Sequence, residues 1–110
     1  MFDILIKNGT IVDGSGTPAF RGDLAVRNGK IAKIAPSIDG DAKEIIDAAG
    51  LQVTPGFIDS HSHSDENILH GGGGCYDYLL QGTTTQVAGQ CGSSPAPYYS
   101  GTGNEFEIPP

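Results

Sequence analysis

The chain has 110 residues, the length of one ordinary domain, and carries a net charge of −7 at pH 7. This acidic balance argues against nucleic acid or an anionic membrane as a partner, because both bind basic surfaces. The sequence has no apolar run near the roughly 18 residues of a membrane span, no secretory signal pattern, and only two cysteines, which are too few for a disulfide framework. We therefore expect a cytoplasmic protein with free thiols.

The first half of the chain predicts β hairpins. Runs of β-prone residues flank Asn8-Gly9 and again Asn28-Gly29. Asn-Gly is the strongest short hairpin signal, because a type I′ turn needs positive φ at both central residues. One more strand, a turn and a short extended piece follow. The pattern predicts a small antiparallel sheet over residues 1–55.

The character of the sequence changes at Gly56. The run FIDSH is typical of a short apolar strand, CYDYLLQ has apolar residues at helical spacing, and TTTQVAGQC is β-branched at its start. A strand, a loop, a short helix and a strand make a βαβ unit. An eight-stranded α/β barrel takes roughly 250 residues. We therefore expect residues 56–110 to begin a larger α/β domain, and the chain to be the N-terminal piece of a longer protein.

Two histidines stand one residue apart where the first apolar strand of this half ends. Alternate side chains of a strand point to one face, so His61 and His63 are expected to point the same way. Imidazole nitrogen is a good ligand for zinc, and the C-terminal strand ends of parallel α/β folds carry their active residues. Taken alone, a His-x-His pair is more often two ordinary histidines than a metal site.

Cys91 lies at the end of the next predicted strand. Neighbouring strands are about 4.8 Å apart, so ligands from two adjacent strand ends can share one zinc ion. The alternative is a small buried hydrophobe, which is common for free cysteine. Asp59 has the same parity as His61 and could orient a ligand, and Asp65 could support the site from the loop. For both carboxylates the alternative is a capping or solvated side chain.

Four segments carry a family resemblance. VTPGFIDSHSHSD resembles the first barrel strand of the metal-dependent amidohydrolase superfamily. GTTTQVAGQCGSSPAP resembles the second-strand segment of its N-acyl-D-amino-acid deacylase (D-aminoacylase) group, which carries a metal-binding cysteine; Gln90 stands where that group often has asparagine. The opening segments DILIKNGTIVDGSG and GDLAVRNGKIAKI resemble the small β-sandwich that precedes the barrel in these enzymes.

The resemblance implies an α/β fold with two parts. Residues 1–55 would form an N-terminal antiparallel β-sandwich portion. Residues 56–110 would form the first βαβ unit, with the first two strands, of a TIM-type (β/α)8 barrel that is incomplete in this chain.

The resemblance also implies a function. It is the zinc-dependent hydrolysis, with one or two Zn²⁺ ions, of the amide bond in a small N-acyl-D-amino acid or related amide. His61 and His63 take the place of the first-strand metal histidines, and Cys91 that of the cysteine ligand. The family's general base lies on a later strand, so we expect no catalytic residue before Pro110 and no activity from this chain alone. The oligomeric state is not predicted.

Two other functions remain open. One is a cyclic-amide hydrolase of the dihydroorotase or hydantoinase kind, which leaves Cys91 without a role. The other is a non-catalytic protein that binds a metal or a partner through the unfinished barrel edge. A coding sequence that continues past Pro110 into further histidine-bearing βα units favours the enzyme, whereas a stop codon there favours the binding protein.

Overall fold

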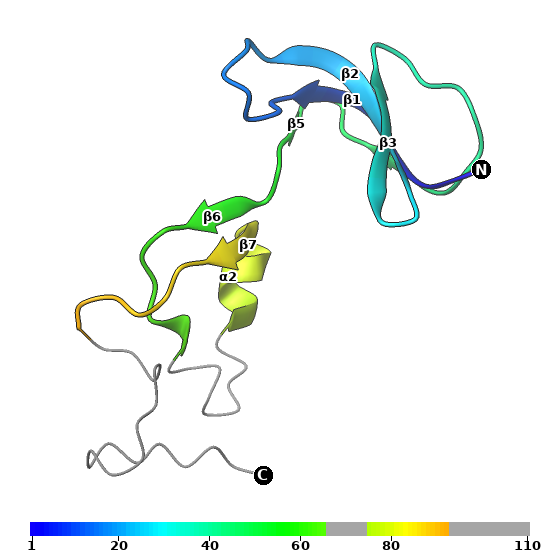
Figure 1. Ribbon diagram of the computed structural model, residues 1–110. Coiled ribbons are helices and arrows are strands. Elements are labelled where there is room, and N and C mark those ends of the chain that lie inside the picture. Colours follow the sequence, from blue (N-terminus) through cyan, green and yellow to red (C-terminus); the bar gives the residue numbers. More distant parts are fainter. Residues whose placement is uncertain (66–74, 93–110) are drawn as a thin grey trace. The chain divides into compact units, whose positions relative to one another are not determined.

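The computed structural model describes residues 1–65 and 75–92, in two compact units, Met1–Pro55 and Gly56–Pro110 (Figure 1). Part of the loop predicted between the two strands of the second unit lies outside the described residues. Within the described part of the chain, no helix has the length and apolar character needed to cross a membrane.

The N-terminal unit is a five-stranded mixed sheet. Its strands are β1 (Phe2–Ile11), β2 (Phe20–Arg27), β3 (Lys30–Ala35), β4 (Ala42–Asp47) and β5 (Gln52–Val53). The β1–β2 and β2–β3 pairs are antiparallel, whereas β4 and β5 both pair parallel with β1. The expected antiparallel sheet is therefore wrong for the last two strands. The cause is a crossover, because residues 36–41 return the chain across the sheet to the start of β1.

The crossover covers one face of this sheet. Its Ile38 is buried against Leu5 of β1 and Ala25 of β2, and these three side chains form the core of the unit. The register places Leu5 opposite Ala25 and, on the other side, opposite Ile45 of β4. All of these side chains therefore belong to the covered face.

The other face of the sheet is an open aliphatic surface. Cross-strand pairing places its members side by side in two rows, Ile34–Leu24–Ile6–Ile46 and Ile31–Val26–Ile4. A β-bulge between Ala25 and Val26 brings Ile31 and Ile34 to the same face, although three positions separate them. Ile31 is 63% exposed and Ile34 41% exposed, so we call this the open face.

The predicted hairpin at Asn28-Gly29 is present between β2 and β3. Asn28 has a φ of 53° and Gly29 a φ of 70°. Both values are positive, as a type I′ turn requires. Asparagine is one of the few residues other than glycine that adopt this conformation readily.

The hairpin predicted at Asn8-Gly9 is wrong, because β1 runs straight through that pair. Asn8 has positive φ, 63°, but Gly9 is not among the residues with positive φ. The pairing moves from Ile6 opposite Leu24 to Gly9 opposite Gly22, so β1 holds one extra residue. Asn-Gly therefore forms a β-bulge here rather than a turn.

A buried carboxylate fixes this bulge. Asp23 Oδ1 accepts the backbone N–H of Asn8 at 2.9 Å, and Oδ2 accepts that of Ile38 in the crossover at 2.9 Å. Lys7 Nζ lies 3.5 Å from Oδ2 and also donates to the carbonyl of Ile38 at 3.2 Å. Burial alone would raise the pKa of Asp23, but the two N–H donors and the Lys7 charge outweigh it and hold that pKa below its usual value.

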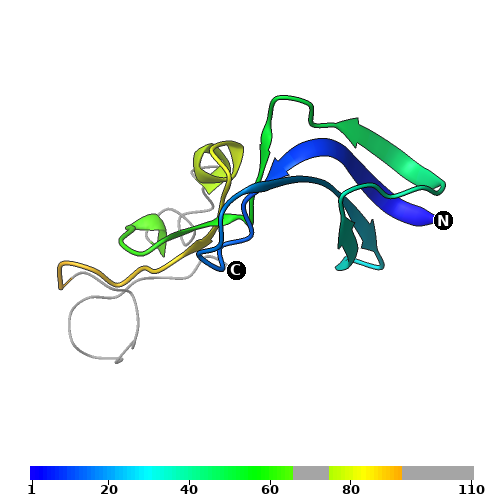
Figure 2. The same cartoon turned by 90° about the horizontal axis from the view of Figure 1, so that it is seen from above.

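The C-terminal unit contains β6 (Phe57–Asp59), α2 (Tyr76–Leu80) and β7 (Thr83–Gln86). β6 and β7 pair parallel, and α2 lies beside β7 (Figures 1 and 2). The helix ends where the sequence predicts, because Gly82 follows it with a φ of 85° and donates its N–H to the carbonyl of Leu79.

Candidate metal centre

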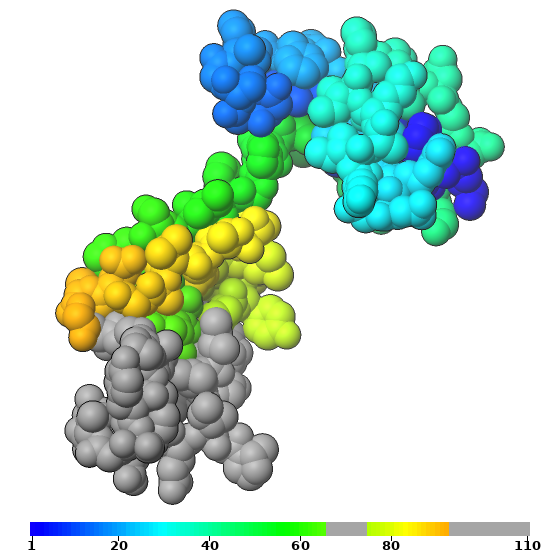
Figure 3. Space-filling view, viewed as in Figure 1, coloured from blue at the N-terminus to red at the C-terminus, as the bar shows by residue number. Residues whose placement is uncertain are grey.

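The two histidines lie just after β6 rather than on it. The strand ends at Asp59, but its pairing with the neighbouring segment continues: Val87 N–H donates to Asp59 O at 2.8 Å, and Ser62 N–H donates to Val87 O at 3.0 Å. Figure 3 shows the green atoms of β6 and the residues after it running alongside the yellow and orange atoms of β7 and the residues after it. The histidines are therefore not on the strand, where the sequence predicted them, but both are exposed and their rings lie together, and the two segments stay paired up to the site.

The predicted ligands come together. The ring centroids of His61 and His63 are 5.7 Å apart, with the ring planes at 62°. Cys91 Sγ lies 3.4 Å from Nε2 of His61. The ligand atoms of all three residues lie within 4.8 Å of one another, and all three side chains are exposed. Cys91 is exposed among the described residues, which does not support its interpretation as a buried hydrophobe.

Cys91 is placed by a turn and not by the end of a strand. β7 ends at Gln86, five residues earlier. Cys91 has a φ of 56°, in the left-handed region, and Gly89 and Gly92 on either side have φ values of 82° and 73°. A residue other than glycine in this region is uncommon, and such residues cluster at functional sites. The glycines let the chain turn so that the thiol faces His61.

The donor set fits zinc. Two imidazoles and a thiol are the ligand types that zinc prefers. Bond lengths of about 2.0–2.3 Å in a tetrahedron put neighbouring ligand atoms about 3.5 Å apart. The distance of 3.4 Å between Cys91 Sγ and His61 Nε2 already equals this edge. The ligand nitrogen of His63 lies within 4.8 Å of the other two ligand atoms.

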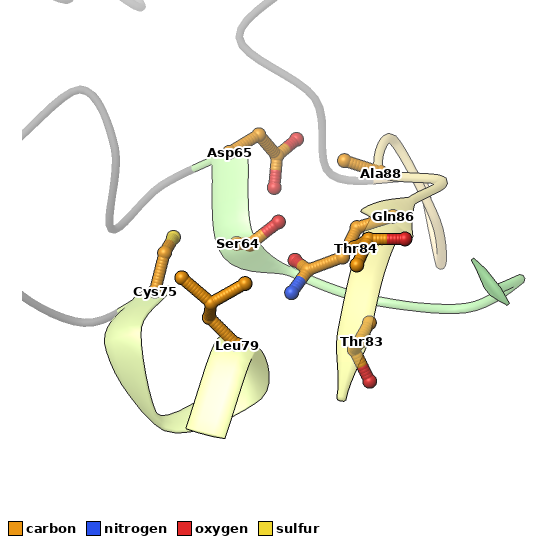
Figure 4. Close-up of a pocket in the computed structure, with 8 residues that line it drawn as sticks. All are labelled: Ser64, Asp65, Cys75, Leu79, Thr83, Thr84, Gln86 and Ala88. Atoms are coloured by element: carbon orange, nitrogen blue, oxygen red, sulfur yellow. The ribbon is translucent and has the colours of Figure 1, made fainter. Parts of the chain in front are cut away.

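The two candidate supporting carboxylates differ in position. Asp59 Oδ1 accepts the backbone N–H of His61 at 3.0 Å, so it fixes the main chain of a predicted ligand. Asp65 does not join the three-residue cluster. It lines an open pocket of about 440 Å³ instead, with Ser64, Cys75 and residues of α2 and β7 (Figure 4). Among the described residues, Asp65 Oδ1 is buried and has no hydrogen-bond partner.

Sequence reasoning missed a buried polar chain beside the histidines. Ser62 and Ser64 are only 4% and 3% exposed. Their hydroxyls lie 2.9 Å apart, and Ser62 Oγ donates to Gln86 Oε1 at 3.1 Å. Figure 4 shows the Gln86 amide extending from β7 toward Ser64. The alternating sequence HSHS, residues 61–64, could have indicated this polar chain. In an extended segment the serines point to the side opposite the histidines.

The segment matches known proteins closely. A model of the amidohydrolase family matches residues 44–108. D-aminoacylase of Alcaligenes xylosoxydans xylosoxydans is 48% identical over 96 residues, which cover 87% of this chain and 20% of that protein. Allantoinase of Escherichia coli strain K12 / DH10B is 48% identical over 65 residues, which cover 59% of this chain and 14% of that protein.

Solved structures agree with the sequence matches. The crystal structure of N-acyl-D-glutamate deacylase from Bordetella bronchiseptica, complexed with zinc and a phosphonate inhibitor, superposes with a TM-score of 0.76 at 42% identity. The match covers 87% of this chain and 20% of that one. The chain thus spans about one fifth of the length of these relatives.

Proposed function

Because the chain belongs to the amidohydrolase family, we propose that it forms the N-terminal part of a zinc-dependent hydrolase of N-acyl-D-amino acids. The observation that carries the proposal is the convergence of His61, His63 and Cys91 within 4.8 Å. The long matches to D-aminoacylase and to N-acyl-D-glutamate deacylase support this substrate class. We call the proposed longer chain that contains residues 1–110 the complete polypeptide.

The two units have separate places in the proposed enzyme. Residues 1–55 form a portion of a β-sandwich. The open aliphatic face of their sheet is evidence for this assignment, because a second sheet could pack against it. Residues 56–110 begin a (β/α)8 barrel with its first two strands. The parallel pairing of β6 with β7, with α2 between them in the chain, supports this assignment.

The residues of this chain supply part of the chemistry. His61, His63 and Cys91 hold one or two zinc ions, and Asp59 fixes the main chain of His61. When bound, zinc supplies Lewis-acid polarisation of the scissile carbonyl. Within the described ranges no carboxylate joins the ligand cluster. In the amidohydrolases that this chain resembles the general base lies on a later strand, so we assign it to the polypeptide beyond Pro110, and the chain by itself is inactive in this proposal.

A cyclic-amide hydrolase is the second candidate. The match to allantoinase favours it, although that match covers less of the chain than the match to D-aminoacylase. The exposed Cys91 thiol beside His61 favours the deacylase, because the cyclic-amide proposal leaves this cysteine without a role.

The cysteines provide a matched test in the complete polypeptide. Cys91→Ala removes the proposed sulfur ligand, so we expect the zinc content, measured by elemental analysis after dialysis, to fall together with turnover of an N-acetyl-D-amino acid. Cys75→Ala is the control, since Cys75 lines the separate pocket and should leave the zinc content unchanged. An unchanged zinc content in Cys91→Ala would count against the deacylase-type site. If the protein hydrolysed a cyclic amide instead of an N-acetyl-D-amino acid, the second candidate would be favoured.

A further inference from the structure

Ser62 occupies an unusual place in the metal centre, because it is buried between two exposed histidines. Its only proton goes to Gln86 Oε1, at 3.1 Å. The hydroxyl of Ser64, 2.9 Å away, must therefore donate to Ser62 Oγ, and the backbone N–H of Ser64 donates to the same oxygen at 3.3 Å. One donated and two accepted hydrogen bonds use the full capacity of a hydroxyl.

Ser62 is also tied to the neighbouring segment through its backbone. Its N–H donates to the carbonyl of Val87 at 3.0 Å, next to the side-chain bond to Gln86. Both bonds join the histidine segment to the stretch of chain that leads from β7 to Cys91. The first bond fixes the backbone of Ser62 and the second fixes its side chain, and both flanking histidines share that backbone.

A second cross-link lies closer to the cysteine. Gln90 Nε2 donates to the carbonyl of Ser60 at 3.5 Å, a long hydrogen bond. Gln90 directly precedes Cys91, and Ser60 directly precedes His61. The ligand-bearing segments are therefore joined by Ser62 on the buried side and by Gln90 at the exposed carbonyl of Ser60.

We propose that Ser62, held by Gln86, is a positioning residue that sets the span between the His61–His63 pair and Cys91. The inference rests on the metal site of the proposed function. Groups outside the ligand set that orient the ligands commonly change metal affinity by about 10–100-fold when they are removed. Ser62 acts in this way through the backbone it shares with both histidines, and it is not itself a member of the ligand cluster.

The test uses Co²⁺ bound to the complete polypeptide, because cobalt reports its ligands by absorption. Ser62→Ala is expected to weaken Co²⁺ binding by about tenfold or more, and to shift the thiolate-to-cobalt band and the d–d bands. Ser62→Thr keeps the hydroxyl and should restore both signals. Ser60→Ala is the matched control, since it removes one exposed serine hydroxyl from the same segment.

The outcomes separate the two proposals. If Ser62→Ala binds Co²⁺ with unchanged affinity and spectrum, even at a lower melting temperature, Ser62 serves only the fold and the inference is wrong. If Ser62→Ala does not fold, Gln86→Met removes the acceptor from the other end of the bond and must give the same loss. If the unsubstituted protein binds no Co²⁺ or Zn²⁺, the metal site of the proposed function fails, and this inference fails with it.

Discussion

At the residue scale, Asp23 holds together parts of the N-terminal unit that are far apart in the sequence. Its two oxygens accept N–H groups from the β1 bulge and from the crossover that carries Ile38. A buried carboxylate is costly unless it is paired and hydrogen-bonded, and here it is both. Asparagine in its place could accept only one of the two N–H groups and would turn an amide NH₂ toward the other.

We expect Asp23→Asn to lower the free energy of unfolding at pH 7 by about 1–3 kcal/mol. The folded state lowers the pKa of Asp23, so the carboxylate contributes stability above its unfolded pKa of about 3.9, and this contribution is lost as pH falls through the lower folded value. The difference between the two proteins should therefore shrink below about pH 4. Urea unfolding at pH 7, 5 and 3 measures this difference in the free energy of unfolding. Asp39→Asn is the control, because Asp39 is exposed. A pH-independent difference would contradict the charge assignment.

At the element scale, the spacing of β6 and β7 is set by a glycine. A Cβ atom on Gly56, just before β6, would overlap the side chain of Thr84 on β7. The two strands can therefore approach closely only because Gly56 has no side chain. The same pairing carries the histidine segment toward Cys91, so the spacing bears directly on the candidate site.

Gly56→Ala is expected to destabilise the C-terminal unit by about 1–3 kcal/mol, because the added methyl group overpacks the strand pair. Thr84→Ala removes most of the obstructing atoms and should cost little alone, since Thr84 is exposed. The double variant should recover part of the loss. A double-mutant cycle by urea unfolding measures the coupling. Additive effects of the two substitutions would show that the predicted contact is absent.

The elements also show where sequence reasoning works and where it fails. Both Asn-Gly pairs carry the same signal, yet one forms a turn and the other a bulge, because the buried Asp23 accepts the Asn8 N–H inside a continuous strand. The parallel placement of β4 depends on a crossover that local patterns do not encode. The hairpin at Asn28-Gly29 and the end of α2 follow from local propensity, and the choice of His61, His63 and Cys91 as candidate ligands follows from residue type.

The buried serine chain was not predicted, because its basis is a long-range pairing. Ser62 and Gln86 are 24 positions apart, and only the register of the two segments brings them together. Cys91 likewise meets His61 through a left-handed turn that depends on its own φ rather than on the strand period. Residue types indicated the chemistry of the site, and tertiary pairing determines its geometry.

At the scale of the whole molecule, the open face of the N-terminal sheet needs a second layer. A sheet with an apolar face is stable when that face is buried against another layer, and large exposed apolar patches mark contact surfaces. The chain spans about one fifth of the length of its relatives. We expect the cover to come from the rest of the complete polypeptide, as a second sheet of the proposed β-sandwich.

Two isoleucines of similar exposure test this expectation. Ile31 lies on the open face and is 63% exposed, whereas Ile45 lies on the opposite face and is 60% exposed. If a second sheet covers Ile31 in the complete polypeptide, Ile31→Lys removes an aliphatic group from that contact and places a charge there. We therefore expect it to destabilise the complete polypeptide by about 2 kcal/mol or more. Ile45→Lys should have a much smaller effect on thermal unfolding. Equal effects of the two substitutions would refute a cover on the open face.

The central claim is that His61, His63 and Cys91 share one metal centre. The most direct test is a crystal structure of the complete polypeptide with zinc. Anomalous difference maps, calculated from data collected on either side of the zinc absorption edge, would locate the ion. The account predicts zinc within about 2.3 Å of Cys91 Sγ and about 2.1 Å of a ring nitrogen of each histidine, as one shared ion or as two adjacent ions. Zinc bound elsewhere, or beside the histidines with the Cys91 thiol turned away, would contradict it.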